Sequence, residues 1–127
     1  MGTFRVAIEI GDAAGERWET VEALVDTGAT YTTVPAELLR RLGVTPHARD
    51  TFVLADGRRV EHDIGHSWIR VSGRSVVTLV VFAGPEATPL LGAYTLEGLR
   101  FAPDPIGRRL VPVPGLLMAP RVLTLAA

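Results

Sequence analysis

The sequence contains no cysteine. Disulfide bridges, catalytic thiolates, zinc–cysteine sites and iron–sulfur clusters are therefore excluded. An excess of charge is missing as well, because 13 basic and 14 acidic residues leave a formal net charge of -1. The basic side chains are scattered and form no stripe, so neither nucleic acid nor an anionic membrane surface is expected as a partner.

Long apolar runs are also absent. No stretch reaches the roughly 20 residues of a membrane span. The first ten residues alternate apolar and polar side chains, whereas a signal peptide has a continuous apolar core. We therefore expect a cytoplasmic protein, with which the lack of cysteine is compatible. The chain has 127 residues, 47% of them hydrophobic, and we expect a single domain over residues 1–127.

Short apolar segments separated by turn residues run through the chain. They predict strands at 4–10, 17–25, 51–55, 58–62, 66–72, 75–82 and 109–113. Short helices are expected at 35–42 and 93–99. Asp56-Gly57, between two extended segments, predicts a two-residue hairpin turn with positive φ at both positions. This pattern is typical of a mostly β fold, a small closed or semi-closed barrel with one or two short helices.

One acidic residue follows directly on an apolar strand end. The segment from Ala23 to Thr30 reads ALVDTGAT, with Asp26 after three apolar residues. Aspartate is common in turns, where its carboxylate accepts backbone N–H groups, so a structural role is one interpretation. The small residues after it let another backbone or a ligand come close. A carboxylate at the mouth of an apolar core is also a candidate for acid–base chemistry.

Other catalytic chemistries find little support in the sequence. No Gly-x-Ser-x-Gly motif is present, so the usual serine nucleophile signature is missing. His62 and His66 have a spacing that can bind metal on a helix, but in a strand they would lie roughly 13 Å apart. We therefore expect no metal and no cofactor. Carboxylates remain, and water activation between two of them requires one base and one acid.

Two motifs carry a family resemblance. Asp26-Thr27-Gly28-Ala29 resembles the active-site loop of the aspartic proteases. Leu90-Leu91-Gly92, followed by a short helix, resembles the second signature of that family. The order of the intervening elements also matches, with a helix, a hairpin around Asp56-Gly57 and a long apolar strand. The chain is similar to the retroviral-type, single-lobe branch, in particular to bacterial retropepsin-like proteins, over about residues 4–113.

The resemblance implies an aspartic endopeptidase with Asp26 as its catalytic residue. Thr27 and Gly28 would support the active site, and Ala29 and Thr30 would contact the substrate. In these enzymes two carboxyls share a proton because close like charges do not both ionise. That logic is established for aspartic proteases and is not deduced from this chain.

The resemblance also implies a flap over residues 52–61 that covers an extended peptide bound as an added strand. Its tip, Ala55, Asp56, Gly57 and Arg58, would contact the substrate. This tip is polar and charged, whereas retroviral flaps are rich in glycine and apolar at the tip.

The chain holds a single Asp-Thr-Gly motif. A pair of catalytic carboxyls therefore requires a second copy, and we expect a homodimer with one Asp26 from each subunit on a two-fold axis. The extension at 114–127 could add an intersubunit strand, or form an edge strand or a disordered end. An alternative function is a catalytically weak peptide-binding or dimerisation module on the same fold.

Overall fold

The computed structural model describes residues 3–115 and 117. The elements are β1 (Phe4–Gly11), β2 (Trp18–Val25), β3 (Thr32–Pro35), α1 (Ala36–Arg41), β4 (Ala48–Val53), β5 (Arg59–Val71), β6 (Arg74–Ala83), β7 (Leu90–Leu91), α2 (Ala93–Leu99), β8 (Phe101–Asp104) and β9 (Arg109–Pro112). Neither helix, at six and seven residues, has the length that crossing a membrane requires.

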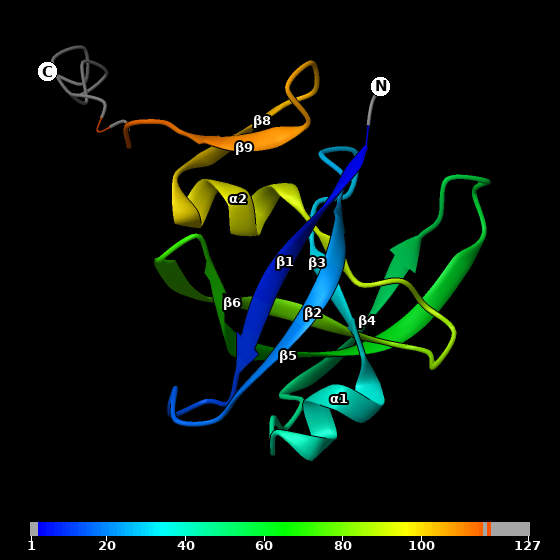
Figure 1. Ribbon diagram of the computed structural model, residues 1–127. Helices are drawn as coiled ribbons and strands as arrows, with labels where there is room; N and C mark the ends of the chain where they lie inside the picture. The colour runs from blue at the N-terminus through cyan, green and yellow to red at the C-terminus, as the bar shows by residue number, and fades with distance from the viewer. Residues whose placement is uncertain (1–2, 116, 118–127) are drawn as a thin grey trace, which may run out of the picture.

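Six strands form a closed ring. Their order is β1-β2-β7-β3-β6-β5, and β5 pairs back onto β1 through Trp68–Arg70 and Glu9–Gly11. β4 continues the sheet beyond β5, while β8 and β9 form a separate two-stranded sheet (Figure 1). The prediction of a mostly β barrel with two short helices is confirmed.

The core fills the inside of this ring. In β1, Phe4, Ile8 and Ile10 are buried, as their alternation with polar residues predicts. Helix α1 begins after Pro35 and buries Leu38 and Leu39. Apolar side chains from both sheet and helices therefore meet in one cluster.

β5 is a single strand of 13 residues, and the prediction of two strands separated near Gly65 is wrong. Gly65 is buried within the strand. A Cβ atom at this position would lie 3.1 Å from the Phe82 ring and 3.1 Å from the Thr45 carbonyl oxygen. The glycine therefore permits a close approach of neighbouring chain segments and does not end the strand.

The turn between β4 and β5 also differs from its prediction. The Gly57 N–H donates to the Leu54 carbonyl at 2.9 Å, and the Leu54 N–H donates to the Arg58 carbonyl at 2.8 Å. Gly57 has φ +88°, whereas Asp56 does not have positive φ. The loop thus has three residues and ends in a glycine bulge, so the predicted two-residue turn is wrong.

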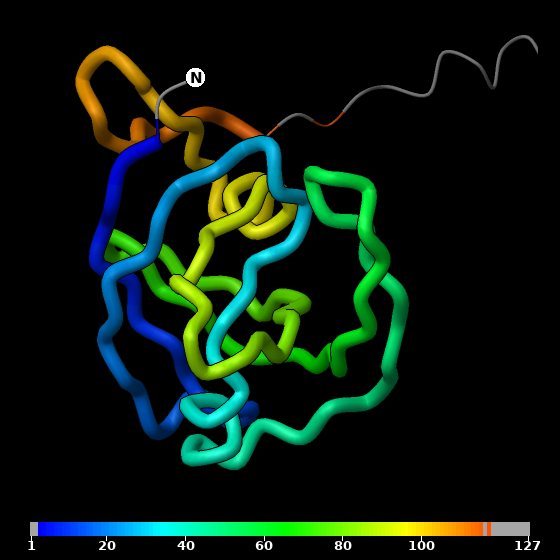
Figure 2. The backbone as a smooth tube through the Cα atoms, turned by 90° about the vertical axis from the view of Figure 1, so that its right-hand side faces the viewer, coloured from blue at the N-terminus to red at the C-terminus, as the bar shows by residue number. Residues whose placement is uncertain are grey.

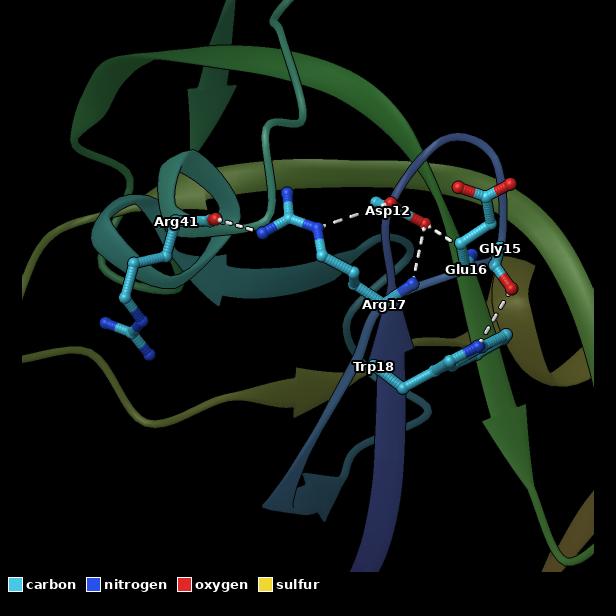
Figure 3. Close-up of polar contacts among 6 residues, drawn as sticks. All are labelled: Asp12, Gly15, Glu16, Arg17, Trp18 and Arg41. Carbon is cyan, nitrogen blue, oxygen red and sulfur yellow. Dashed lines mark hydrogen bonds and ion pairs between the residues drawn. The ribbon is translucent and has the colours of Figure 1, made fainter.

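The turn between β1 and β2 is held by one carboxylate (Figure 3). Asp12 Oδ1 accepts the backbone N–H groups of Glu16 at 2.7 Å and Arg17 at 3.2 Å. The Arg17 guanidinium lies 3.7 Å from Asp12 Oδ2 and also donates to the Arg41 carbonyl of α1 at 3.2 Å. These N–H groups, first that of Glu16, lower the pKa of Asp12. Asp12 therefore holds the turn, and Arg17 joins the hairpin to α1.

The hairpin of β8 and β9 lies beside α2, and its first strand was not predicted because Pro103 and Pro105 are typical of a loop. Figures 1 and 2 show its tip, the turn after β2 and the tip of the β4–β5 hairpin on the same side of the molecule. Most of the extension at 114–127, which was considered as a possible dimer strand, lies outside the described residues.

Candidate active site

Asp26 lies in the turn at the end of β2. Val25 before it is buried, the Asp26 side chain is half-buried, and Thr27 and Gly28 are exposed. The Gly28 N–H donates to Asp26 Oδ1 at 2.9 Å, and the Ala29 N–H donates to the Asp26 carbonyl at 3.1 Å. One carboxylate oxygen is thus held by the turn itself, which fixes the orientation of the side chain.

The turn is anchored to the second signature segment. The Asp26 N–H donates to the Leu91 carbonyl at 3.2 Å. At the start of α2, the N–H groups of Ala93 and Tyr94 donate to the carbonyls of Ala29 and Thr30, each at 2.9 Å. The structure therefore brings together two motifs that lie about 65 residues apart in the sequence, and the first turn of a helix supports the aspartate loop.

Gly92 makes this close contact possible. A Cβ atom at Gly92 would lie 2.6 Å from the carbonyl carbon and 2.7 Å from the carbonyl oxygen of Tyr31. Its N–H donates to Thr32 Oγ1 at 3.1 Å. A side chain at this position would push the aspartate loop away from α2. The third residue of the Leu-Leu-Gly motif is therefore a glycine for a steric reason.

Three buried threonines lie beneath the loop. Thr32 Oγ1 and Thr95 Oγ1 are 2.6 Å apart, and Thr95 Oγ1 lies 3.1 Å from Thr78 Oγ1. All three side chains are at most 3% exposed. Their hydroxyls join β3, α2 and β6, so the support of the aspartate loop extends into the barrel core.

The Asp26 carboxylate has no cationic partner among residues 3–115 and 117. Each of the ion pairs in this part of the chain involves other acidic residues. At the tip of the β4–β5 hairpin, by contrast, Asp56 accepts the Arg58 N–H at 3.0 Å and lies 2.8 Å from its guanidinium. Both contacts, first the backbone N–H, lower the pKa of Asp56.

A cleft of about 650 Å³ separates the aspartate loop from the β4–β5 hairpin. Gly28, Ala29 and Thr30 form part of one side. The remaining lining residues are Tyr31, Thr33, Thr51, Phe52, Val53, Leu54, Val60, His62, Val81, Ala83, Ala87, Thr88 and Leu90. The walls are mostly apolar.

The predicted site residues at the hairpin tip lie outside this cleft lining. Ala55, Asp56, Gly57 and Arg58 are exposed, and the hairpin side of the cleft is formed by residues nearer its base. Their contact with substrate stays a prediction. Phe52, Leu54 and Val60 line the cleft and lie within the predicted flap over residues 52–61, whereas Tyr31 and His62 were not predicted as cleft residues.

Aromatic rings connect the hairpin to the aspartate loop. The Tyr31 ring meets the Phe52 ring edge-on at a centroid distance of 6.1 Å, and it lies 6.2 Å from the Tyr94 ring. The three rings come from the aspartate loop, β4 and α2. The Tyr31 and Phe52 rings therefore bring the two walls of the cleft into contact on one side.

His62 and His66, both on β5, have different neighbours. His62 lines the cleft, with its ring 6.3 Å from Phe52, while the His66 ring stacks on His47 at 4.6 Å. Within residues 3–115 and 117, no group of three or more His, Asp or Glu side chains is placed to hold a metal ion.

A closed six-stranded barrel with an aspartate turn beside a mostly apolar cleft is consistent with the architecture of an aspartic protease lobe. A family model described as aspartyl protease matches residues 6–95, and the chain belongs to this family. It is retropepsin-like. The solution structure of the simian foamy virus (mac) protease is similar, with a TM-score of 0.53 and 25% sequence identity over 72% of this chain and 90% of that chain. A search of curated proteins finds no match.

Proposed function

We propose that the protein is a homodimeric aspartic endopeptidase in which the two Asp26 carboxyls, one per subunit, activate a water molecule. The observation that carries this proposal is the setting of Asp26. Its turn is supported from below by Leu91 and the start of α2, it has no cationic partner within the described residues, and it borders the cleft through Gly28. A single copy supplies one such carboxyl, and the second would come from a second chain.

The two carboxyls would take different roles. The ionised one removes a proton from water, whose oxygen attacks the carbonyl carbon of the peptide bond, while the protonated one donates its proton to the carbonyl oxygen. In the second step the carboxyl that took the proton from water donates it to the nitrogen, the other carboxylate takes a proton from a diol hydroxyl, and the C–N bond breaks to give an acid and an amine. The Gly28 N–H, at 2.9 Å from Asp26 Oδ1, supports this assignment because it keeps the carboxyl oriented through both steps.

The substrate would be an extended peptide in the cleft. Ala29 and Thr30 on one wall leave room for its backbone, and the β4–β5 hairpin would cover it as a flap over residues 52–61. The apolar lining of the cleft supports binding of apolar side chains. Thr27, exposed beside Asp26, would contact the equivalent loop of the second subunit.

The test is cleavage of a peptide library at acidic to neutral pH by the wild-type protein and by Asp26→Asn. We expect cleavage by the wild type only, and inhibition by pepstatin-like compounds. Equal cleavage by Asp26→Asn would contradict the proposal. Peptide binding without turnover in the wild-type dimer would instead support the alternative, a peptide-binding module, which the self-contained Asp56–Arg58 pair at the hairpin tip favours.

A further inference from the structure

The surface around Asp26 limits how two copies can meet. If two Asp26 carboxyls share a proton, their oxygens lie within about 3 Å of each other. Any groups that flank Asp26 on its exposed side must then contact the second copy. This inference rests on the proposed function. It makes the surface around Asp26 the candidate surface for the dimer.

A second hollow, distinct from the cleft, lies on this side of Asp26. It has a volume of about 230 Å³ and is lined by Thr3, Val25, Asp26, Thr27, Gly28, Pro103 and Pro105. Because a water molecule in the liquid occupies about 30 Å³, the hollow has room for a whole aliphatic side chain. Its wall combines the aspartate turn, the start of β1 and the β8–β9 hairpin.

The β8–β9 hairpin has an ordered tip. Asp104 Oδ1 accepts the backbone N–H groups of Ile106 and Gly107, each at 3.1 Å, and Arg109 Nε lies 3.6 Å from Asp104 Oδ2. A Cβ atom at Gly107 would lie 2.6 Å from the same carboxylate. The tip is therefore held in one conformation by the side chain that precedes it.

This ordered tip carries an apolar side chain in solvent. Ile106 is 94% exposed, although its neighbour Pro105 lines the hollow. Ile106 itself does not line it, so within one copy the side chain points away from the space beside it. An isoleucine left in water forgoes the stabilisation that burial of its apolar surface gives.

We propose that Ile106 of each copy packs into the hollow beside Asp26 of the other copy. The contact is isologous, since the same tip and the same hollow are used twice across one two-fold axis. The apolar side chain of Ile106 would contact Val25 and the two prolines in the wall of the hollow, next to the residue that must meet its counterpart. Figures 1 and 2 show the hairpin tip and the turn after β2 on the same side of the molecule.

The first test compares Ile106→Asp with Val77→Asp by sedimentation velocity over a concentration series. Val77 is also an exposed apolar residue, 47% exposed, but it lies on β6 in a groove away from Asp26. We expect Ile106→Asp to raise the dimer dissociation constant by roughly 30-fold or more, as for a central interface residue. Val77→Asp should keep the wild-type value. An unchanged dissociation constant for Ile106→Asp would overturn the inference.

Cleavage measurements separate this inference from the proposed function. For Ile106→Asp, cleavage should fall at low chain concentration and return toward the wild-type rate per dimer at high concentration. Asp26→Asn should remain dimeric and inactive at every concentration. If Asp26→Asn is inactive while Ile106→Asp dimerises normally, the function stands and the surface is wrong. If the wild type cleaves as a strict monomer, both fail.

Cross-linking provides a test that does not depend on loss of binding. Because the chain has no cysteine, single substitutions give specific disulfides. Chains with Ile106→Cys, mixed with chains carrying Thr3→Cys at the edge of the hollow, should form a covalent dimer on mild oxidation. The mixture of Val77→Cys with Thr3→Cys should not. Equal cross-linking in both mixtures would contradict the inference.

Discussion

The two ends of β2 each carry an aspartate in a turn, and their surroundings differ. Asp12, before the strand, accepts two backbone N–H groups and faces the Arg17 guanidinium. Asp26, after the strand, accepts only the Gly28 N–H and has no ion pair in the described part of the chain. The same residue type therefore has different partners in the turns at the two ends of one strand.

The two turns differ in what holds them in place. At Asp12 the carboxylate holds the turn together, so the side chain is the support (Figure 3). At Asp26 the backbone of the turn is held by Leu91, Ala93 and Tyr94, so the side chain is supported by the rest of the fold. The Asp26 carboxylate thus accepts fewer of the N–H groups of its own turn than the Asp12 carboxylate does.

The largest expected effect separates the two aspartates by activity. Asp26→Asn keeps an oxygen that can accept the Gly28 N–H but loses the ability to exchange a proton. We expect peptide cleavage to fall by about 10²–10⁴-fold or more, the usual contribution of a general acid or base. Asp12→Asn keeps the turn acceptor and should cleave at the wild-type rate. Initial rates with a fixed peptide measure both, and a similar loss in both variants would contradict the comparison.

The next effect concerns the support beneath Asp26. Gly92→Ala would place a Cβ atom 2.6 Å from the Tyr31 carbonyl carbon, so either α2 or the aspartate loop must move. We expect a destabilisation of about 1–3 kcal/mol, as for other overpacked sites, together with weaker cleavage. Gly84→Ala, where no atom lies within 4 Å, is the matched control. Urea denaturation measures the free energy of unfolding of both variants. Equal values for Gly92→Ala and Gly84→Ala would show that the loop tolerates the added Cβ atom.

A smaller effect is expected one layer deeper. Thr32→Val preserves the shape of the side chain but removes the acceptor of the Gly92 N–H and the contact with Thr95. A buried donor left without a partner costs about 1–3 kcal/mol, and relaxation of the loop keeps the value near the lower end. Thr20→Val on the exposed side of β2 is the control. Denaturation midpoints measure the difference, which should vanish if the N–H finds another acceptor.

The smallest effect is a pH dependence at the Asp12 turn. The pKa of Asp12 is lowered in the folded protein, first by the Glu16 N–H, so its contribution to stability is present above the unfolded pKa of about 4. That contribution is lost as the pH falls through the folded pKa. Asp12→Ala should therefore lower the melting temperature by a few degrees at pH 7, and by less below pH 4. A difference that grows in acid would contradict this assignment.

Much of the fold follows from local patterns in the sequence. Period-two alternation identified β1, the apolar run identified β6, and Pro35 with the following leucines identified α1. β8 was missed because its prolines suit a loop, yet a two-stranded sheet tolerates proline at an edge. β5 was divided in two because a glycine in a strand can mark an end or a close approach, and only the neighbouring Phe82 decides which.

The candidate site also has parts that the sequence predicts and parts that only the structure gives. The sequence pointed to Asp26, the Leu-Leu-Gly segment and a flap over residues 52–61, but the contact between the Tyr31 and Phe52 rings in the cleft wall follows only from the structure. These rings belong to separate elements, and their contact depends on how the β4–β5 hairpin folds over the barrel.

By itself, the sequence determined the Asp26 turn, because the bond between Gly28 and the carboxylate joins residues two apart and needs no other part of the chain. Only the tertiary structure places hydrogen-bonded groups from distant parts of the chain beneath this turn. The Thr32–Thr95 and Thr32–Gly92 bonds join residues 63 and 60 positions apart, and such contacts form only when the strand ring closes. A local hydrogen bond orients the Asp26 carboxylate. Closure of the sheet brings Leu91 and the start of α2 against the turn and leaves Thr27 and Gly28 exposed.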